Sequence, residues 1–318
     1  MRVLITGAAG FLGRKLAAVL LSDGLSGTAV HELILWDQLP IAAPEISDVI
    51  IRSVSGDLLD EECQEAAMGD GIDAVFHLAA VVSAQAEADF DLGLRVNIDG
   101  TRALLGACRK LGTCPRFVTT SSVAAFGGEL PDLVPDTQAP TPRSTYGMTK
   151  VVGELMVSDY ARKGFVDGRV IRVPTVSVRP GKPNQAASSF ASSIIREPLN
   201  GEAAVCPVAP DTPIWLTSPR RAVTALVKAA EIDAAALGDD RVITLPGLRT
   251  TPEEMTEALA RIGGAAAAAR VEWTRNEDIE AIVASWPGAF AATRAKALGF
   301  GADESMDEII QAHIEDEL

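Results

Sequence analysis

The chemistry of this sequence centres on Tyr146 and Lys150, four residues apart, which follow the Ser121–Ser122 pair. A tyrosine hydroxyl has an ordinary pKa of about 10 and is a poor base at neutral pH unless a nearby cation favours its ionised form. On a helix, Lys150 lies on the same face as Tyr146 and can supply that cation. A serine hydroxyl opposite can hold the substrate oxygen. These residue types predict removal of a proton from an alcohol, as its oxidation by a nicotinamide requires.

A glycine-rich turn near the N-terminus favours this catalytic interpretation over the structural alternative, a tyrosine packed on a lysine stem. Residues 2–6 predict a strand and residues 14–21 a helix, with Gly7, Gly10 and Gly13 between them in GxxGxxG spacing. Gly7 allows a tight turn, Gly10 lets the backbone approach a pyrophosphate, and Gly13 allows close helix–strand packing. The helix N-terminus then faces the phosphates. A glycine triplet between a strand and a helix predicts a dinucleotide site.

Asp37 follows a second apolar run, residues 32–36, and lies 24 residues beyond Gly13. An acidic side chain there accepts hydrogen bonds from the adenosine ribose and repels a 2′-phosphate. The alternative interpretation is an ordinary turn residue at the end of a strand. We therefore expect NAD as the cofactor rather than NADP.

With these residues, the chain resembles the extended short-chain dehydrogenase/reductase superfamily (the NAD-dependent epimerase/dehydratase family) over nearly its full length. Counted back from Gly127, the resemblance implies that Ser122 is the catalytic serine beside Tyr146 and Lys150, with Ser121 as the alternative. It implies a cofactor site made of Gly7, Gly10, Phe11, Leu12, Gly13, Asp37, Asp57, Leu58, Leu78, Ala79, Ala80, Asn97, Ser121, Tyr146, Lys150, Pro174 and Val176.

Longer segments narrow the resemblance to the D-erythronate dehydrogenase family. They are residues 78–83, 88–93, 179–184, 188–192, 195–199 and 218–221. Members of that family oxidise the C2 hydroxyl of a four-carbon sugar acid to the 2-keto acid with NAD. The resemblance therefore implies conversion of D-erythronate to 2-dehydro-D-erythronate by a homodimer. The substrate rests on this analogy, whereas the reaction type rests on residues.

A carboxylate substrate requires local positive charge in a chain whose formal net charge is −15. The fork of an arginine suits a carboxylate best. The sequence from Pro174 to Pro219 is Pro- and Ser-rich and predicts irregular loops that cover a pocket. The predicted substrate-binding residues are Ser83, Ser122, Arg143, Tyr146, Ser177, Lys182, Asn184, Ser189 and Arg196.

Other functions stay open as alternatives. A uronate or another aldonate dehydrogenase is compatible with the same residues, because hydroxyl discrimination depends on a few hydrogen bonds. A nucleotide-sugar epimerase is disfavoured, since residues 215–220 depart from the basic and aromatic motif usual there. A dehydratase is disfavoured because no acidic residue flanks Ser122. A non-enzymatic NAD sensor is disfavoured because the Tyr/Lys pair is retained.

Composition sets outer limits on the function. The chain has 318 residues, 47% of them hydrophobic, enough for a sizeable core in one or two domains. Its acidity disfavours nucleic-acid and anionic-membrane partners. The four cysteines lack CxxC spacing and the three histidines are scattered, which predicts a reducing, cytoplasmic compartment and no metal site. No apolar run approaches the roughly 18 residues that span a bilayer.

The elements that must position these residues alternate between strand and helix up to about residue 175. Strands are expected near residues 2–6, 32–36, 50–54, 73–78, 115–121 and 168–173. This alternation predicts an α/β fold with a Rossmann-like, doubly wound parallel sheet. We assign residues 1–174 to an NAD-binding domain, which a late strand near 241–245 rejoins. Residues 175–318 are assigned mainly to a smaller C-terminal substrate-binding lobe.

Overall fold

The computed structural model describes residues 1–41, 49–69, 71–181 and 187–318. Its largest sheet contains seven parallel strands in the order β10-β6-β5-β4-β1-β2-β3. These strands are β1 (Arg2–Thr6), β2 (Glu32–Asp37), β3 (Ile50–Ser55), β4 (Ala74–His77), β5 (Arg116–Ser122), β6 (Asp167–Val173) and β10 (Val242–Thr244). The order reverses between β1 and β4, and ligands bind at such a switch point, beyond the carboxyl ends of the strands. The predicted doubly wound α/β fold is confirmed.

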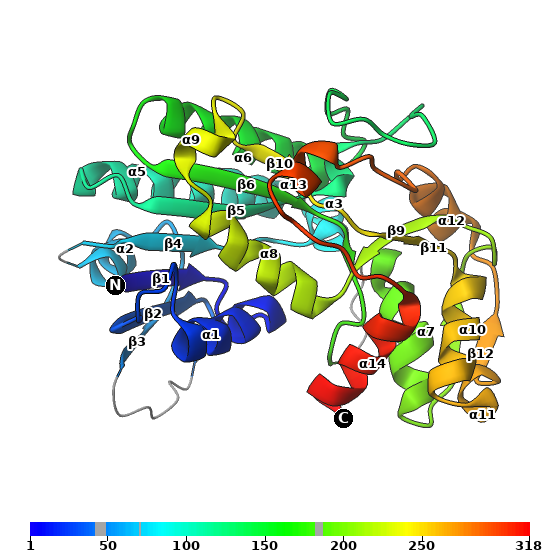
Figure 1. Ribbon diagram of the computed structural model, residues 1–318. Coiled ribbons are helices and arrows are strands. Elements are labelled where there is room, and N and C mark those ends of the chain that lie inside the picture. The colour runs from blue at the N-terminus through cyan, green and yellow to red at the C-terminus, as the bar shows by residue number, and fades with distance from the viewer. Residues whose placement is uncertain (42–48, 70, 182–186) are drawn as a thin grey trace.

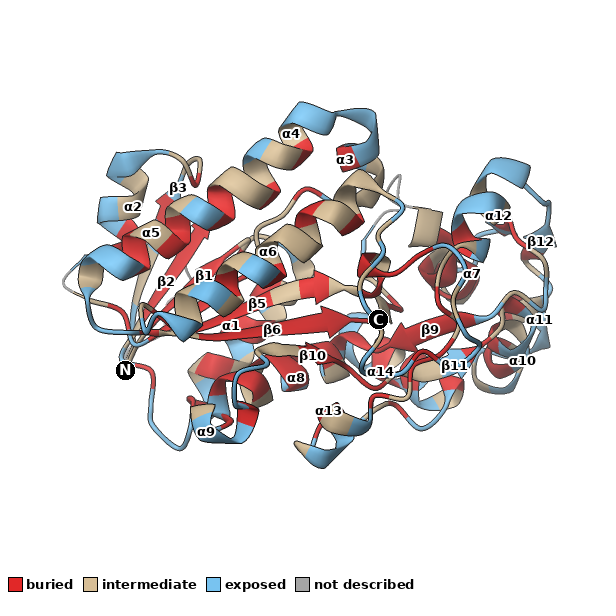
Figure 2. Cartoon of the chain, turned by 90° about the horizontal axis from the view of Figure 1, so that it is seen from above, coloured by how far each residue is buried: buried red, intermediate tan, exposed pale blue. Residues whose placement is uncertain are grey.

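Helices cover both faces of this sheet (Figures 1 and 2). One face carries α2 (Glu61–Met68), α5 (Thr101–Leu111) and α6 (Thr145–Arg162), and the other carries α1 (Phe11–Asp23) and α8 (Pro219–Glu231). Strands buried on both faces are continuously apolar rather than alternating, as the fully buried run Val3-Leu4-Ile5 illustrates. The sheet therefore has a separate hydrophobic core on each side.

A smaller lobe packs beside the carboxyl ends of the strands, on the right in Figure 1. Its helices are α7 (Phe190–Leu199), α10 (Pro252–Ile262), α11 (Ala265–Ala268), α12 (Glu277–Ala284) and α14 (Met306–Glu317). It has a three-stranded sheet of β7 (Thr175–Val176), β9 (Ile214–Thr217) and β11 (Leu248–Thr250), and a pair formed by β8 (Ala204–Cys206) and β12 (Val271–Trp273). The core of this lobe is built from α7, α10 and α14 packed around β9.

Short elements complete the chain. They are α3 (Ser83–Ala88), α4 (Phe90–Leu94), the π-helical segment η1 (Arg95–Gly100), the 3-10 turns η2 (Val123–Ala125) and η3 (Ala187–Ser189), α9 (Ala234–Leu237) and α13 (Thr293–Ala297). The segment α3–α4–η1 leads directly into α5, so the chain that leaves β4 passes over the switch point before it turns back along the sheet.

The prediction of irregular structure between Pro174 and Pro219 is wrong over α7. This helix has apolar residues at Phe190, Ile194 and Ile195, the spacing of an amphipathic helix, and all three are buried. Pro198 lies inside this helix, in its last turn, where it removes one backbone hydrogen bond. The late segment near 241–245 forms β10, which pairs in parallel with β6. Because α8 and β10 follow Pro174 and pack against the large sheet, the two lobes interleave in sequence.

Candidate active site

A cavity of about 1750 Å³ lies where the carboxyl ends of the large sheet meet the smaller lobe. The glycine turn after β1 lines one end, and Tyr146 and Lys150 lie further along. Residues of η3 and α12 close the side that belongs to the smaller lobe. This volume exceeds the roughly 300–1,000 Å³ of an ordinary small-molecule pocket, and it suits a dinucleotide together with a small second ligand.

The glycine turn packs so closely against neighbouring backbone that it leaves no room for side chains. Gly7 has φ +71°, and a Cβ on it would lie 2.6 Å from the backbone nitrogen of Ala79. A Cβ on Gly13 would lie 2.4 Å from the carbonyl oxygen of Gly7. Gly10 is the N-cap residue of α1, so the exposed N–H groups of that helix begin at the cavity wall. The cradle fits a pyrophosphate, because backbone donors and the positive end of a helix dipole converge on it.

Two carboxylates follow the ends of β2 and β3 at the same end of the cavity. Asp37 accepts hydrogen bonds from the N–H of Ala9 at 3.0 Å and of Leu39 at 3.1 Å. Asp57 accepts from the backbone of Leu59 and pairs with Arg95 at 2.7 Å. Each carboxylate has about four lone-pair sites, so Asp37 keeps capacity for the hydroxyl groups of a ribose. Asp37 thus both fixes the glycine turn and faces the cavity.

Tyr146 and Lys150 occupy the first turns of α6, whose N-cap Ser144 accepts the N–H of Gly147 at 3.0 Å. Lys150 Nζ lies 5.5 Å from the centre of the Tyr146 ring and donates to the carbonyl oxygen of Thr120 at 3.0 Å. Burial raises the pKa of Tyr146, against a smaller lowering by Arg179 and by the hydroxyl of Ser122. Burial lowers the pKa of Lys150 to about 8, which the charge of Glu154 opposes.

The two neighbouring serines have different environments. Ser121 is buried, and its hydroxyl donates to Glu154 Oε1 at 2.5 Å. Ser122 is half-buried, accepts the N–H of Ala124 at 3.1 Å, and lies close enough to Tyr146 to affect its pKa. Both residues line the cavity. The hydroxyl of Ser122 is therefore the one available to a ligand beside Tyr146.

A buried ion pair lies behind Lys150. Arg172 on β6 donates to both carboxylate oxygens of Glu154, at 2.8 and 2.7 Å, and its guanidinium stacks over Phe126. Glu154 follows Lys150 by one helical turn and also accepts the hydroxyl of Ser121. Both carboxylate oxygens of Glu154 thus accept hydrogen bonds, and its charge raises the pKa of Lys150 against the larger lowering by burial.

Asn97 lies behind the cavity wall rather than on it. Its side-chain amide exchanges hydrogen bonds with the backbone of Val81 at 2.8 and 3.1 Å and donates to Thr149 at 3.1 Å. It belongs to the π-helical segment η1, a local distortion that often marks functional sites. Asn97 therefore ties the loop after β4 to the residue that precedes Lys150.

Most of the predicted cofactor residues line the cavity. Besides the glycines, the carboxylates and the Ser121, Tyr146 and Lys150 side chains, they are Phe11, Leu12, Leu58, Leu78, Ala79, Ala80, Pro174 and Val176. Their convergence follows from the topology, because parallel strands end at one edge of a sheet. The cavity thus collects residues from almost every connection on this side of the sheet.

The predicted substrate residues divide into three groups. Ser83, Arg143 and Ser189 line the cavity together with Ser122 and Tyr146. Ser177 and Arg196 do not: the hydroxyl of Ser177 donates to Ala191, and Arg196 pairs with Glu197 at 2.6 Å. Both are buried and already bonded, which argues against the prediction that they bind substrate. Lys182 and Asn184 lie outside the described residues.

Arg179 and Trp286 are among the cavity residues that the sequence interpretation missed. Arg179 lies within residues 179–184, one of the segments that resemble the D-erythronate dehydrogenase family. It follows the predicted substrate residue Ser177 by two positions, and this proximity could have suggested it. Trp286 follows α12, more than 100 residues further along the chain, where no local motif marks it. The spacing of residues along the sequence does not reveal side chains that only the packing of two lobes brings together.

Other classes of site have less support in the described part of the chain. His77 is buried between the hydroxyls of Thr6 and Thr101, and burial, with a smaller effect of Lys150, lowers its pKa to about 3. Across residues 1–41, 49–69, 71–181 and 187–318, no cluster of His, Cys, Asp and Glu could hold a metal ion. The same residues contain no helix that is long and apolar enough to cross a membrane.

Known proteins resemble this chain over its full length. The profile of the NAD dependent epimerase/dehydratase family matches residues 3–218. D-erythronate dehydrogenase of Cupriavidus necator is 57% identical over 99% of this chain and 98% of that protein, and the Haemophilus influenzae D-erythronate dehydrogenase is 44% identical over 99% of each. The crystal structure of the nucleoside-diphosphate-sugar epimerase from Agrobacterium tumefaciens has a TM-score of 0.95 at 45% identity, covering 100% of this chain and 94% of that one.

Proposed function

The chain belongs to the NAD dependent epimerase/dehydratase family, and we propose that it is an NAD-dependent dehydrogenase that oxidises D-erythronate to 2-dehydro-D-erythronate. The observation that carries the proposal is the cluster of Ser122, Tyr146 and Lys150 on one wall of a cavity whose far end is a dinucleotide cradle. The 57% identity to a D-erythronate dehydrogenase over 99% of the chain supports the choice of substrate.

In this proposal, Tyr146 as the phenolate accepts the proton of the C2 hydroxyl. Ser122 orients the substrate oxygen by a hydrogen bond, which its half-buried position beside Tyr146 permits. When bound, NAD accepts the hydride that leaves C2. The glycine turn, Asp37 and Asp57 would hold its pyrophosphate and adenosine, and Lys150 would bind the nicotinamide ribose.

Lys150 supplies the positive charge that makes Tyr146 a usable base. Its own burial works against that charge, and Glu154 restores it through the carboxylate held by Arg172. The order along α6 matters, because Tyr146, Lys150 and Glu154 are spaced four residues apart and follow one face of the helix. Arg172 and Glu154 thus belong to the electrostatic support of the reaction, without contact with the substrate.

The test is NADH formation by purified protein with NAD and a panel of four- to six-carbon aldonates and uronates at about pH 9. We expect selective turnover of D-erythronate. Turnover of uronates or another aldonate alone would keep the Tyr/Lys chemistry and reject the substrate. The similarity to an enzyme named as a nucleoside-diphosphate-sugar epimerase makes that activity the second candidate. Interconversion of nucleotide sugars without net NADH would favour it.

We further propose that the enzyme is a cytoplasmic homodimer. Two exposed apolar side chains, Phe90 on α4 and Leu155 on α6, lie on helices that contact each other beside the sheet. A partner surface would cover them. The cysteines in the described residues are unpaired thiols, which suits a reducing compartment. Light scattering at micromolar concentration tests the dimer, and a monomeric mass would reject it.

A further inference from the structure

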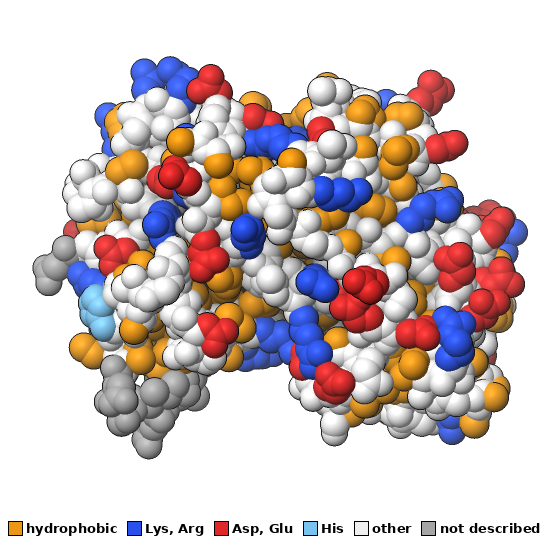
Figure 3. Space-filling view, in the orientation of Figure 1, with side chains coloured by type: hydrophobic (Ala, Val, Ile, Leu, Met, Phe, Trp, Pro, Cys, Tyr) orange, Lys and Arg blue, Asp and Glu red, His pale blue; other side chains and the backbone are white. Residues whose placement is uncertain are grey.

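A 2-hydroxy acid places a strict condition on its binding site. The carboxylate is attached to the carbon that bears the reacting hydroxyl, so the group that binds the carboxylate must lie within a few ångströms of the catalytic base. On the face of the molecule in Figure 3, acidic and basic side chains are interspersed. Because the chain has a net charge of −15, a cation inside the cavity, close to Tyr146, would have to supply the attraction for an anionic substrate.

We propose that Arg179 is the residue that binds the substrate carboxylate. This inference rests on the proposed oxidation of a sugar acid and adds a residue for the recognition of its charge. Arg179 lines the same cavity as Tyr146 and Ser122. It follows β7, whereas Tyr146 lies on α6, so the two side chains reach the cavity from different elements.

The electrostatic environment of Arg179 distinguishes it from other arginines. Among the described residues, buried Arg169, Arg172 and Arg196 each pair with a carboxylate, those of Asp167, Glu154 and Glu197. No carboxylate in the described ranges lies within ion-pair distance of Arg179, although it is half-buried. A guanidinium removed from water without an opposite charge is costly, and an anionic ligand would provide the missing partner.

The charge of Arg179 reaches the catalytic base directly. It lowers the pKa of Tyr146, and Tyr146 in turn raises that of Arg179, although burial lowers the pKa of the arginine overall. Both side chains also line the same cavity. A carboxylate bound there would lie beside the phenol, as the 2-hydroxy acid requires.

The structure also holds the guanidinium in place. Arg179 Nε donates to the carbonyl oxygen of Val176 at 2.9 Å, and Nη2 lies 3.4 Å from Ser188 Oγ. Its backbone N–H donates to Ser192, and its carbonyl oxygen accepts from Arg196 at 2.6 Å. Since a guanidinium has five N–H donors, others remain for a ligand. Arg196, which the sequence suggested as a ligand, supports the backbone of Arg179 instead.

Arg143 is the other arginine on the cavity wall, and its position is less suitable. It is exposed, and its side chain packs over the Gly127–Gly128 turn, within 3.0 Å of where a Cβ on Gly128 would lie. An exposed guanidinium is screened by water and contributes less than a half-buried one. Arg249, exposed on β11 of the smaller lobe and outside the cavity lining, serves as the matched control for removal of a positive charge.

The experiment compares Arg179→Gln, Arg179→Lys and Arg249→Gln with the wild type. For Arg179→Gln we expect the KM for D-erythronate to rise at least ~10²-fold, as for loss of a desolvated charge pair, with the Kd for NAD unchanged. Arg179→Lys should recover part of this loss, since it restores charge without the fork. Arg249→Gln should change KM by less than about threefold. Circular dichroism and NAD binding verify folding.

A neutral substrate analogue tests whether Arg179 recognises the negative charge of the substrate carboxylate. The wild type should prefer D-erythronate to its amide, and in Arg179→Gln this preference should fall to near unity. A KM within about threefold of the wild type in Arg179→Gln would overturn the inference and leave the proposed function intact.

Binding of D-erythronate to the Tyr146→Phe protein loaded with NAD separates the remaining outcomes. Binding that requires Arg179, without turnover in the wild type, would support the carboxylate site and reject the reaction. Absence of both binding and turnover would reject both proposals.

Discussion

The two halves of the cavity are built in different ways. The half nearer β1–β3 is formed by backbone and by side chains from short contiguous stretches, such as the turn from Gly7 to Gly13. The half nearer the small lobe takes Arg179, Ser189 and Trp286 from segments spread over more than 100 residues. The first half fits a ligand shared by many proteins, whereas the second determines what this protein acts on.

This difference teaches where specificity is encoded. A pyrophosphate is recognised by N–H groups and a helix dipole, which any sequence supplies if glycines permit the approach. A small polyhydroxy acid is recognised by a few side-chain hydrogen bonds and one charge. Tyr146 and Lys150 lie between the halves, because α6 runs from the small lobe back along the sheet. Mutations can therefore be assigned to one half, the other, or their junction.

The largest effect is expected at the junction. Tyr146→Phe removes the proposed base and keeps the ring, so turnover of D-erythronate should fall at least ~10²-fold. NAD affinity should stay within about threefold of the wild type, because the cofactor half is untouched. Steady-state NADH formation and NAD titration measure the two quantities.

The other tyrosine of the chain provides the control for this variant. Tyr160 also lies on α6 but packs edge-on against Phe165, with ring centres 5.7 Å apart. Tyr160→Phe should keep full activity. Full turnover in Tyr146→Phe would reject the assignment of the base and would leave the junction without a catalytic role.

The cavity contains more of the residues predicted for the cofactor than of those predicted for the substrate, for a physical reason. Gly7, Asp37 and the Tyr146/Lys150 pair are defined by spacing along a strand, a turn or a helix, which sequence displays directly. Arg196 and Arg179 are both arginines near α7, and sequence cannot tell which one faces the cavity. The choice depends on Glu197, which neutralises Arg196 within the small lobe.

The elements of the fold were likewise predictable where the sequence pattern is local and not where it depends on distant contacts. Most of the six early strands were predictable because buried parallel strands are continuous apolar runs, whereas β3 at the edge of the sheet is largely exposed. α7 was missed because its serines and Pro198 suggest a loop, and its helical register is visible only in the spacing of Phe190, Ile194 and Ile195. The return of α8 and β10 to the large sheet depends on contacts distant in sequence, which local patterns do not carry.

The next effect in size tests the cofactor half alone. Asp37→Asn removes the negative charge that would repel a 2′-phosphate and keeps a hydrogen-bond acceptor for Ala9. We expect the ratio of kcat/KM for NAD over NADP to fall about tenfold, equivalent to about 1.4 kcal/mol. The KM for D-erythronate should stay unchanged. Asp91→Asn, on exposed α4, is the charge-matched control. An unchanged cofactor preference would assign Asp37 to support of the glycine turn only.

The charge of Lys150 predicts a smaller effect on stability. Its pKa is lowered by burial from 10.5 to about 8 in the folded protein, so the unfolded chain binds more protons between these values. The burial of the charged lysine therefore destabilises the fold fully below pH 8, and this penalty fades toward pH 10.5. Lys150→Met should raise the Tm of the cofactor-free protein at pH 7, by about 2–4 °C for each kcal/mol gained.

The same variant should lose activity, and its gain in Tm should shrink near pH 10. Lys110→Met, at an exposed position on α5, should change neither quantity appreciably. Thermal unfolding followed by circular dichroism at the two pH values provides the comparison. A lower Tm for Lys150→Met at pH 7 would mean that its bond to Thr120 and its attraction to Glu154 exceed the cost of burial.

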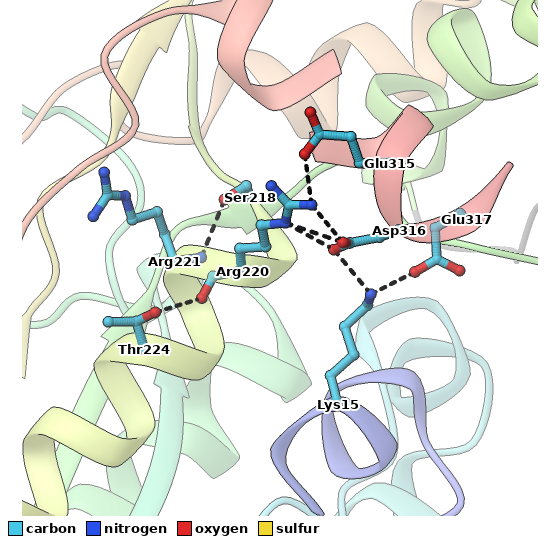
Figure 4. Close-up of polar contacts among 8 residues, drawn as sticks. All are labelled: Lys15, Ser218, Arg220, Arg221, Thr224, Glu315, Asp316 and Glu317. Atoms are coloured by element: carbon cyan, nitrogen blue, oxygen red, sulfur yellow. Dashed lines mark hydrogen bonds and ion pairs between the residues drawn. The ribbon is translucent and has the colours of Figure 1, made fainter. Parts of the chain in front are cut away.

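The smallest effect concerns the ion pairs that join the C-terminal helix to the large sheet's helices (Figure 4). Asp316 on α14 accepts Arg220 Nη2 of α8 at 2.6 Å and Lys15 of α1 at 3.2 Å. Glu315 and Glu317 add contacts to the same two cations. These contacts link the core of the small lobe to the helix that begins at the glycine turn, so they could couple the two halves of the cavity.

Their exposure limits what they contribute. The side chains of Arg220 and Asp316 are 46% and 25% exposed, and pairs of this kind are worth about 0.2–1 kcal/mol. Asp316→Asn should therefore lower the Tm by at most about 4 °C at low salt and by nothing measurable in about 1 M salt, where screening is nearly complete. Asp132→Asn, at an exposed position, is the control. If Asp316→Asn instead weakened NAD and D-erythronate binding together, the two halves would depend on these ion pairs for their relative placement, and their apparent independence would be wrong.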